Sequence, residues 1–365
     1  MRSPLRIAQQ VAVPLVAILL GFLVAGVAVA ITGADPIQAY LGLFQGAFTN
    51  KQAFTESLIA SVPYVFLGLA VATGFRAGLF NIGADGQFYL GALGGVFVGF
   101  SIHGLPGIVH VPLAILAGVA CGAVYGGLPG FLKARFGAHE VITTIMLNYI
   151  AYSLSDYLIN RGPLGDRHSS APKTPLIDPS AQLPIIFADS RLHLGLVLAL
   201  LAVPLMWFLI ERTTIGFRIR AVGLNPEAAR SSGISVARTM VLVMAISGGL
   251  AGLAGADEVL GVAHFMPPSF SIGYGFDAIA VALLARSNPW AILPAAFLFG
   301  AMRNGAGFMQ LQTQVSADMI SIVQATVIMF VAAPVIVRWL LRLRAVPGES
   351  LQITQHQSAE APPET

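Results

Sequence analysis

Residues 211–238 read ERTTIGFRIRAVGLNPEAARSSGISVAR and separate two apolar runs, 193–210 and 239–260. The stretch holds five of the 20 Lys and Arg residues of the chain and only two Glu. Because about 20 apolar residues span a bilayer as a helix, we expect a basic loop between two membrane spans. A polar loop of this kind is typical of a surface that binds a partner.

The composition of the whole chain agrees with this setting. The chain has 365 residues, of which 56% are hydrophobic and only 10% are charged, whereas about 25% are charged in a soluble domain. We therefore predict an all-α polytopic membrane protein. The net charge of +3 gives no support for a nucleic-acid partner, and a single cysteine allows no disulfide framework.

About ten membrane-spanning helices are predicted from the apolar runs, the eighth of which is too short to span unless it extends into 270–274. The predicted spans are 11–31, 57–74, 83–100, 107–130, 140–159, 193–210, 239–260, 275–285, 289–308 and 318–341. Residues 1–344 then form one transmembrane domain that includes the cytoplasmic loop 211–238. The polar residues 345–365 are predicted to be a disordered cytoplasmic tail.

The distribution of Lys and Arg predicts the orientation, because these residues are enriched in cytoplasmic loops. With the N-terminus inside, 14 of them lie on the inner side, five lie on the outer side, and Arg303 lies within a span. This predicts that both termini are cytoplasmic (N-in and C-in), that 211–238 is cytoplasmic and that 160–192 is outside.

A parallel internal repeat is also predicted. The segment 70–76 matches 280–286 at four of seven positions, and each copy ends in an Arg, Arg76 and Arg286. Parallel repeats are common in transporters, although two helices rich in Ala, Gly and Leu can also resemble each other by chance.

The loop 75–87 carries three Gly together with Asn81, Asp85 and Gln87. Irregular backbone at membrane depth is tolerated where it is buried in protein or lines a cavity, and an ionisable residue there suggests a functional site. The alternative is an ordinary cytoplasmic turn. Asn148, within the fifth span, either bonds a neighbouring helix or faces the transport pathway.

The middle of the basic loop contains the signals of a short helix. Asn225 is a good N-cap, Pro226 suits the first helical position and Glu227 favours the first turn. Ala228, Ala229 and Arg230 are helix formers, and Gly233 can supply a left-handed stop. A helix of about seven residues is marginal by itself in water, so it needs a surface, either a partner protein or anionic lipid.

The chain lacks the motifs of an enzyme. None of its lysines follows a glycine, so no phosphate-binding loop is present, and neither His-Glu-x-x-His nor Gly-x-Ser-x-Gly occurs. No catalytic residue and no metal site is predicted. Asp277 and Arg303 lie near the outer ends of adjacent spans, where an ion pair would offset their burial.

Four strings resemble an ABC-importer permease family that serves branched-chain amino acids, ribose and other simple sugars, and nucleosides. FNIGADGQ at 80–87 resembles the signature FNIGAEGQ, with Asp85 in place of the usual Glu. EVITTIMLNYIA at 140–151 resembles EVISTIMLNYIA of the nucleoside-type (basic membrane protein-type) branch. Residues 216–234 resemble the main cytoplasmic loop of the family, and GFDAIAVALL at 275–284 resembles its late-span motif.

The resemblance implies a permease subunit of an ATP-driven importer in the cytoplasmic (inner) membrane of a bacterium, with nucleosides as the first expected substrate class. A separate ATPase subunit would bind ATP and Mg, so this chain carries no cofactor, and would receive the helix at Asn225–Gly233. Arg218, Arg220 and Arg230 would pair with acidic residues there. A second related permease and an extracytoplasmic substrate-binding lipoprotein complete the expected partners, besides membrane lipid.

Pathway or gate positions are predicted at Asn81, Asp85, Gln87 and Asn148. Three alternatives remain: a permease for a simple sugar such as ribose, a secondary transporter that needs no ATPase, and an intramembrane enzyme. Mid-span carboxylates would favour the second alternative, but most acidic residues of this chain lie near the ends of spans.

Overall fold

The computed structural model describes residues 4–187, 189–271, 273–314, 316 and 319–332. Its helices are α1 (Pro4–Ile31), α2 (Pro36–Phe48), α3 (Lys51–Arg76), α4 (Ala84–Ser101), α5 (Gly107–Phe136), α6 (Glu140–Asn160), η1 (Pro179–Ala181), α7 (Gly195–Arg212), α8 (Thr214–Leu224), α9 (Pro226–Ser231), α10 (Val236–Glu258), the π-helix η2 (Val259–Ala263), α11 (Tyr274–Leu284), α12 (Pro289–Thr313) and α13 (Met319–Ala332). The described residues contain no strand beyond an isolated bridge between Ile185 and His193.

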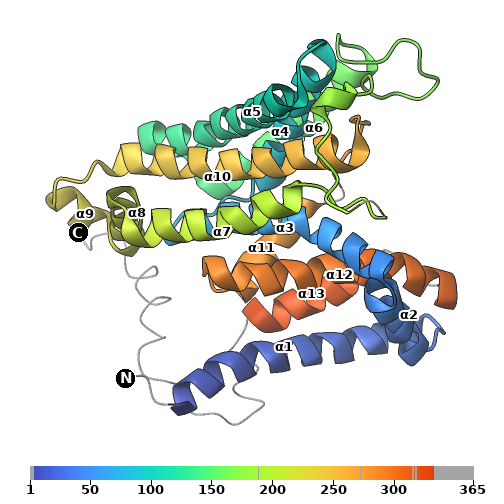
Figure 1. The fold of residues 1–365 in the computed structure, drawn as a ribbon. Helices are drawn as coiled ribbons and strands as arrows, with labels where there is room; N and C mark the ends of the chain where they lie inside the picture. The colour runs from blue at the N-terminus through green and yellow to red at the C-terminus, as the bar shows by residue number, and fades with distance from the viewer. Residues whose placement is uncertain (1–3, 188, 272, 315, 317–318, 333–365) are drawn as a thin grey trace.

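The long helices form one bundle (Figure 1). Helices α4, α5 and α10 pack together on one side of it, and α1 packs against α13 on the other, with α3 and α12 between them. Helices α8 and α9 lie at one end of the bundle, and the segment between α6 and α7 lies at the opposite end (Figure 1). The basic stretch 211–238 and the loop 160–192 therefore lie at opposite ends of the bundle, which agrees with their predicted positions on opposite sides of the membrane.

Among the described residues, four helices are long and apolar enough to cross a membrane, or five if α1 and α2 count as one bent span. A helix lies in each of the ten predicted segments, and this confirms the helical membrane class. Helix α11 has 11 residues, so it is about 16 Å long and too short for the roughly 30 Å hydrocarbon core. The predicted tail 345–365 and the end of the tenth span lie outside the described residues.

Helix α2 was not predicted from the sequence. The chain turns by 119° between the end of α1 and α2. Asp35 caps α2, because its carboxylate accepts a hydrogen bond from the Ile37 N–H at 2.8 Å, and Pro36 occupies the first helical position. This Asp-Pro pair is an ordinary helix start that a reading by apolar runs alone does not detect.

Glycine allows α5 and α10 to approach at backbone distance. A Cβ atom added at Gly122 would overlap the Gly248 carbonyl oxygen and would lie 2.6 Å from Gly252 Cα. Gly252 also contacts Gly91 of α4. Lipid provides little hydrophobic drive for helices to associate, so this close packing is what joins the three helices.

The two copies of the predicted repeat form the last turns of α3 and α11, which pack against each other. The Arg76 Nε donates to the Ser287 carbonyl at 3.1 Å, which ties the end of one copy to the residue that follows the other. The common ancestry of the two copies stays a prediction.

The glycine contact can be tested with Gly122→Ala. The added methyl group must push α5 from α10, and we expect a loss of roughly 1–3 kcal/mol, measured as a lower thermal midpoint in detergent. Gly127→Ala is the matched control, because a Cβ there lies 3.8 Å from its nearest neighbour, Ala245. Equal midpoints for the two variants would contradict the packing role of Gly122.

Candidate functional site

The segment between α3 and α4 is a folded, partly buried turn. The Leu79 N–H donates to the Gly74 carbonyl at 3.0 Å, and Gly78 has a φ of +69°, which favours glycine. Ala77 and Leu79 are buried beside Ile219, Val243 and Met244. The predicted irregular backbone therefore exists; Ala77 and Leu79 are buried, whereas Gly78 and Phe80 are exposed.

Asn81 and Gln87 form a reciprocal pair of amides. The Asn81 Nδ2 donates to Gln87 Oε1 at 2.8 Å, and the Gln87 Nε2 donates to Asn81 Oδ1 at 3.0 Å. Asn81 also donates to the Ser247 hydroxyl at 2.8 Å, which in turn donates to the Ala70 carbonyl. The pair thus joins the start of α4 to α3 and α10.

Asp85 is the centre of a second set of bonds. Its carboxylate accepts from the Tyr152 hydroxyl at 2.6 Å, the Ser271 hydroxyl at 2.9 Å and the Gly275 N–H at 2.8 Å. Its side chain therefore connects α4, α6 and the start of α11. The sequence separations of 67, 186 and 190 residues explain why local patterns could not reveal these partners.

Helix dipoles favour a carboxylate at this point. Asp85 lies in the first turn of α4 and bonds the first turn of α11, so it faces the positive ends of two helices. The contact needs a residue without a side chain on α11, because a Cβ at Gly275 would lie 2.5 Å from Asp85 Cα.

Asn148 completes this buried junction, which we define as Asn81, Asp85, Gln87 and Asn148. The Asn148 Nδ2 donates to the Ile82 carbonyl at 2.9 Å, and its Oδ1 accepts from the Gly86 N–H at 2.8 Å. All four side chains are at most 2% exposed. The structure therefore brings the four predicted residues together and gives Asn148 an interhelical bond, while a pathway or gate role stays a prediction.

The short helix in the basic stretch has the predicted signals. Asn225 Oδ1 accepts from the Glu227 and Ala228 N–H groups at 3.0 and 3.1 Å, and Pro226 begins α9. Gly233 follows with a φ of +80°. Ala229 is buried against Val222 and Val236, so α9 rests on α8 and α10 and does not stand alone.

Helix α8 precedes it and was missed from the sequence. The Thr213 hydroxyl accepts from the Gly216 N–H at 3.1 Å and caps this helix, one residue after α7 ends. Thr213 could have indicated the start of a new helix, but the residues before and after it both favour a helix, so the boundary was not recognised. Phe217 and Leu224 of α8 are 60% and 75% exposed, and together with α9 they form what we call the α8–α9 surface.

The predicted basic residues of this surface differ in their surroundings. Arg218 is exposed, and Arg230 lies 3.7 Å from Glu227 with both side chains largely exposed. Arg220 instead pairs with Glu211 at 3.3 Å and donates to the Ile210 carbonyl. Its charge is therefore paired within the chain, and of these three arginines Arg218 and Arg230 are the more exposed.

A separate polar cluster lies between α3, α11 and α12. Asp277 and Arg303 form the predicted ion pair at 3.8 Å. The Tyr64 hydroxyl donates to Asp277 at 2.9 Å and accepts from Arg303 at 3.1 Å. The Arg303 guanidinium lies 4.0 Å from the centre of the Tyr274 ring. Neither tyrosine was predicted, because the cluster joins α3, α11 and α12, and Tyr64 is 213 residues from Asp277 in the chain.

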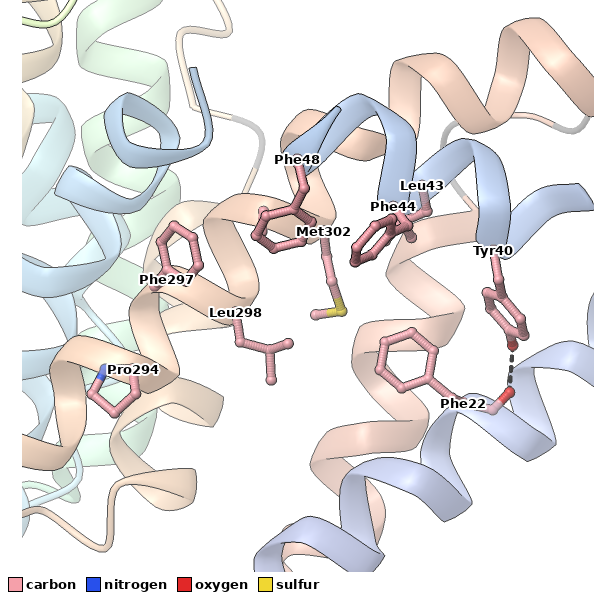
Figure 2. A pocket seen from close by; sticks show the side chains of 10 residues that line it. Phe22, Tyr40, Leu43, Phe44, Phe48, Pro294, Phe297, Leu298 and Met302 are labelled. Carbon is pink, nitrogen blue, oxygen red and sulfur yellow. Dashed lines mark hydrogen bonds between the residues drawn. The ribbon is translucent and has the colours of Figure 1, made fainter. Parts of the chain in front are cut away.

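An apolar cavity of about 440 Å³ lies among α1, α2 and α12 (Figure 2). Its walls include Phe22, Phe44, Phe297 and Met302, and the Tyr40 hydroxyl is bonded to the Phe22 carbonyl. Because the lining has no charged side chain, this cavity does not suit a hydrophilic substrate. Within the described part of the chain, no three His, Cys, Asp or Glu side chains group together as metal ligands.

The helical bundle, its small-residue packing and its folded polar end define a multi-pass membrane protein. Residues 53–332 match the family described as the branched-chain amino acid transport system / permease component, and the chain belongs to this family. It is therefore a permease of the ABC transporter type.

Three curated relatives cover nearly the whole chain. The guanosine ABC transporter permease of Bacillus subtilis (strain 168) is 41% identical, over 90% of this chain and 95% of its own length. A nucleoside ABC transporter permease of Lactococcus lactis subsp. cremoris (strain MG1363) is 36% identical, over 91% and 93%. A glucose ABC transporter permease of Haloferax volcanii is 35% identical, over 87% and 86%.

The role of Asp85 as a structural link can be tested with Asp85→Ala. Three donors, one of them fully buried, would lose their acceptor, and we expect a loss of about 3 kcal/mol, seen as a lower thermal midpoint in detergent. Tyr152→Phe removes one of the three bonds and should cost roughly 1 kcal/mol. Tyr149→Phe, on an exposed face of the same helix, is the control. A stable Asp85→Ala protein would disprove the structural role.

Proposed function

We propose that this chain is the membrane permease subunit of an ATP-driven importer for nucleosides. The observation that carries the proposal is the alignment with two permeases, named for guanosine and for nucleosides, over at least nine-tenths of this chain. The nucleoside-type string at 140–151 supports the same substrate class. We further propose ten membrane spans, of which the one that contains the short α11 crosses only together with the residues that precede this helix, with both termini in the cytoplasm, in the inner membrane of a bacterium.

The α8–α9 surface is the proposed docking site of the ATPase subunit. It offers two exposed apolar side chains, Phe217 and Leu224, beside the exposed cations Arg218 and Arg230. Apolar anchors surrounded by polar groups are typical of protein interfaces. ATP and Mg would bind to the partner, and this chain would receive its movement.

The contacts of α8 supply a route for that movement into the bundle. Gly223 packs against the Arg76 carbonyl and lies so close to Ala77 that an added Cβ would be 3.0 Å from Ala77 Cα. Glu211 pairs with Arg76 at 3.2 Å and with Arg220 at 3.3 Å. A displacement of α8 therefore acts on the end of α3 and on the turn that leads into the buried junction.

We propose that the buried junction serves as the gate region. Asn81, Asp85, Gln87 and Asn148 fix how α4, α6 and α11 meet, and ATP-driven movement of α8 would shift this meeting point and alternate the access to the pathway. In this role the four side chains set helix positions and need not touch the substrate. The proposal also includes a second related permease and an extracytoplasmic substrate-binding lipoprotein that delivers substrate at the end opposite α9.

A simple sugar is the second candidate substrate. The glucose permease relative favours it, because it aligns with 87% of this chain at 35% identity. The identity to the guanosine permease is higher, and for this reason we place nucleosides first.

Docking at the α8–α9 surface can be tested by cysteine labelling. In a Cys121→Ser background, Ala228→Cys places a thiol on the exposed part of α9, and adding the ATPase subunit should slow its reaction with a water-soluble maleimide at least about 10-fold. Ala171→Cys, in the loop at the opposite end, is the control. Equal rates with and without the ATPase would place α9 elsewhere, for example on lipid.

Arg230→Glu and Leu224→Asp should weaken assembly with the ATPase, because each puts a negative charge on the proposed interface. The loss of a central contact in a protein interface costs about 2 kcal/mol of binding free energy, which corresponds to a roughly 30-fold loss in affinity. The measurement is co-purification with the ATPase, and Arg167→Glu in the loop 160–192, at the other end of the bundle, is the control. Wild-type assembly of both variants would rule out this surface.

The function itself is tested by uptake in proteoliposomes. The complete complex should carry labelled guanosine to the side of the membrane that holds the ATPase, and it should do so only when ATP is present on that side. Uptake by this chain alone without ATP would contradict the importer and favour a secondary transporter. Preference for glucose over nucleosides would favour the second candidate.

A further inference from the structure

His193 and Asp257 form a buried pair for which the sequence suggested no role. His193 lies two residues before α7, and Asp257 lies in the last turn of α10. The His193 Nδ1 and the Asp257 Oδ1 are 3.8 Å apart, and the two side chains are 1% and 2% exposed. Because α7 begins at the end of the bundle opposite α9 (Figure 1), the pair lies at the predicted outer end.

Two glycines bring the pair close to the backbone of its neighbours. A Cβ atom added at Gly195, the first residue of α7, would overlap the Asp257 Oδ1, and one added at Gly261 would lie 2.5 Å from the His193 ring. Gly261 belongs to the π-helix η2, and short π-helical turns occur often at functional sites. The backbones of α7 and η2 therefore fix where the carboxyl group and the ring lie.

The pair uses few of its hydrogen-bonding atoms. Buried polar atoms in folded proteins are normally hydrogen-bonded. Within the described part of the chain, however, the two oxygens of Asp257 and the Nε2 of His193 have no hydrogen-bond partner. The ring is bonded through Nδ1, which accepts from the Gly195 N–H at 3.2 Å. Nδ1 thus acts as an acceptor while it faces a second acceptor, an oxygen of Asp257.

The two possible partners of Nδ1 require opposite protonation states. A ring nitrogen accepts a hydrogen bond only without a proton, as Nδ1 does from Gly195, and it donates only with one. An imidazole changes its charge between about pH 5 and pH 8. A proton on Nδ1 would therefore end the bond from Gly195 and make His193 a donor to Asp257. Since 3.8 Å is too long for a hydrogen bond, the two groups must approach each other by about 1 Å.

Movement at this point reaches the segment 177–194, which is bonded to η2 and to the residue after it. The Leu183 N–H donates to the Leu260 carbonyl at 2.9 Å, and the Ile177 N–H donates to the His264 carbonyl at 3.0 Å. The same segment continues directly into α7. The other titratable or charged groups around the pair are Glu258 of α10, His264 after η2, Arg191 beside its partner Glu56 of α3, and Arg303 of α12. Within the described part of the chain, none of these side chains is hydrogen-bonded to the pair.

We propose that His193 and Asp257 form a proton-dependent switch at the outer end of this permease. The unprotonated ring accepts from the first residue of α7, as it does in this structure. When Nδ1 takes a proton from the outer solution, it donates to Asp257 and joins α7 to α10. This added bond has to break whenever the two helices separate, so an acidic outer solution slows the transport cycle. The inference rests on the ATP-driven import proposed above and adds its regulation by pH.

His193→Gln and Asp257→Asn test the switch in the complete transporter, reconstituted in proteoliposomes with the ATPase side held at about pH 7.5. ATP-driven guanosine uptake is measured at an outer pH of about 7.5 and of about 5.5, on the two sides of the imidazole transition. We expect wild-type uptake to fall roughly 10-fold in acid, because a hydrogen bond between charged groups must break in each cycle. Each variant should lose this response, since Gln does not titrate and a buried imidazolium without a carboxylate is unfavourable.

His103→Gln is the matched control. It removes an exposed histidine of the same end, which lies 3.4 Å from Asp178, and it should keep the wild-type response. The double variant of His193 and Asp257 should behave as each single variant does, because the two residues act as one unit. Should one variant fail to assemble, the other carries the test, since the loss of either partner removes the switch. An acid response retained in an assembled single variant overturns the proposal, and so does a wild type without one.

Amide hydrogen exchange at the start of α7 gives a second measurement, which needs no transport. At about pH 5.5 the Gly195 N–H of the wild type has lost its acceptor, so it should exchange faster than in Asp257→Asn at the same pH. At about pH 7.5 the two proteins should exchange alike. Equal exchange at both pH values overturns the switch. Absence of guanosine import by the wild type at the higher pH contradicts the proposed function instead, and the exchange measurement then decides the switch separately.

Discussion

The contact between Asp85 and the first turn of α11 joins the two places where the helical backbone is interrupted inside the bundle, the α3–α4 turn and the start of α11. In a bilayer, each backbone group that leaves a helix needs a partner inside the protein. The turn between α3 and α4 and the start of α11 both break the helical ladder within the bundle. The Asp85 carboxylate accepts from the Gly275 N–H and from the hydroxyls of Ser271 and Tyr152, so one side chain satisfies a backbone group at the start of α11 and ties it to α6.

The close packing of α4, α5 and α10 places this contact. Gly91, Gly122 and Gly252 let the three helices touch along their backbones, and α10 then carries Ser247 to the Asn81–Gln87 pair. At the end of the bundle that bears α9, the same α3–α4 turn is held by α8. The α8–α9 surface, the α3–α4 turn and the buried junction thus form one continuous set of contacts. A permease moved by an external ATPase needs such a set, since movement passes only through elements that are in contact.

Local sequence patterns predicted what depends on neighbours in the chain. Apolar runs located the helices, and Asn225, Pro226 and Gly233 predicted the start and end of α9. Helix α2 was not predicted because an apolar run does not reveal a short helix that follows a sharp turn. Helix α8 was not predicted because a single residue separates it from α7.

The partners in the site could not be predicted, because they depend on the fold. Asp85 was selected as a polar residue in an unusual loop, but only the packed helices show that its oxygens are already occupied. The ion pair of Asp277 and Arg303 was predicted, because both residues lie near the outer ends of adjacent predicted spans, 275–285 and 289–308, and the structure places them 3.8 Å apart.

The most direct test of the account is a density map of the complete transporter with guanosine and a non-hydrolysable ATP analogue. The account predicts α9 in contact with the ATPase and Asp85 still bonded to Tyr152 and to the start of α11. A map with guanosine bound at Asp85 and its bond to Gly275 broken, or with α9 away from the ATPase, would contradict it.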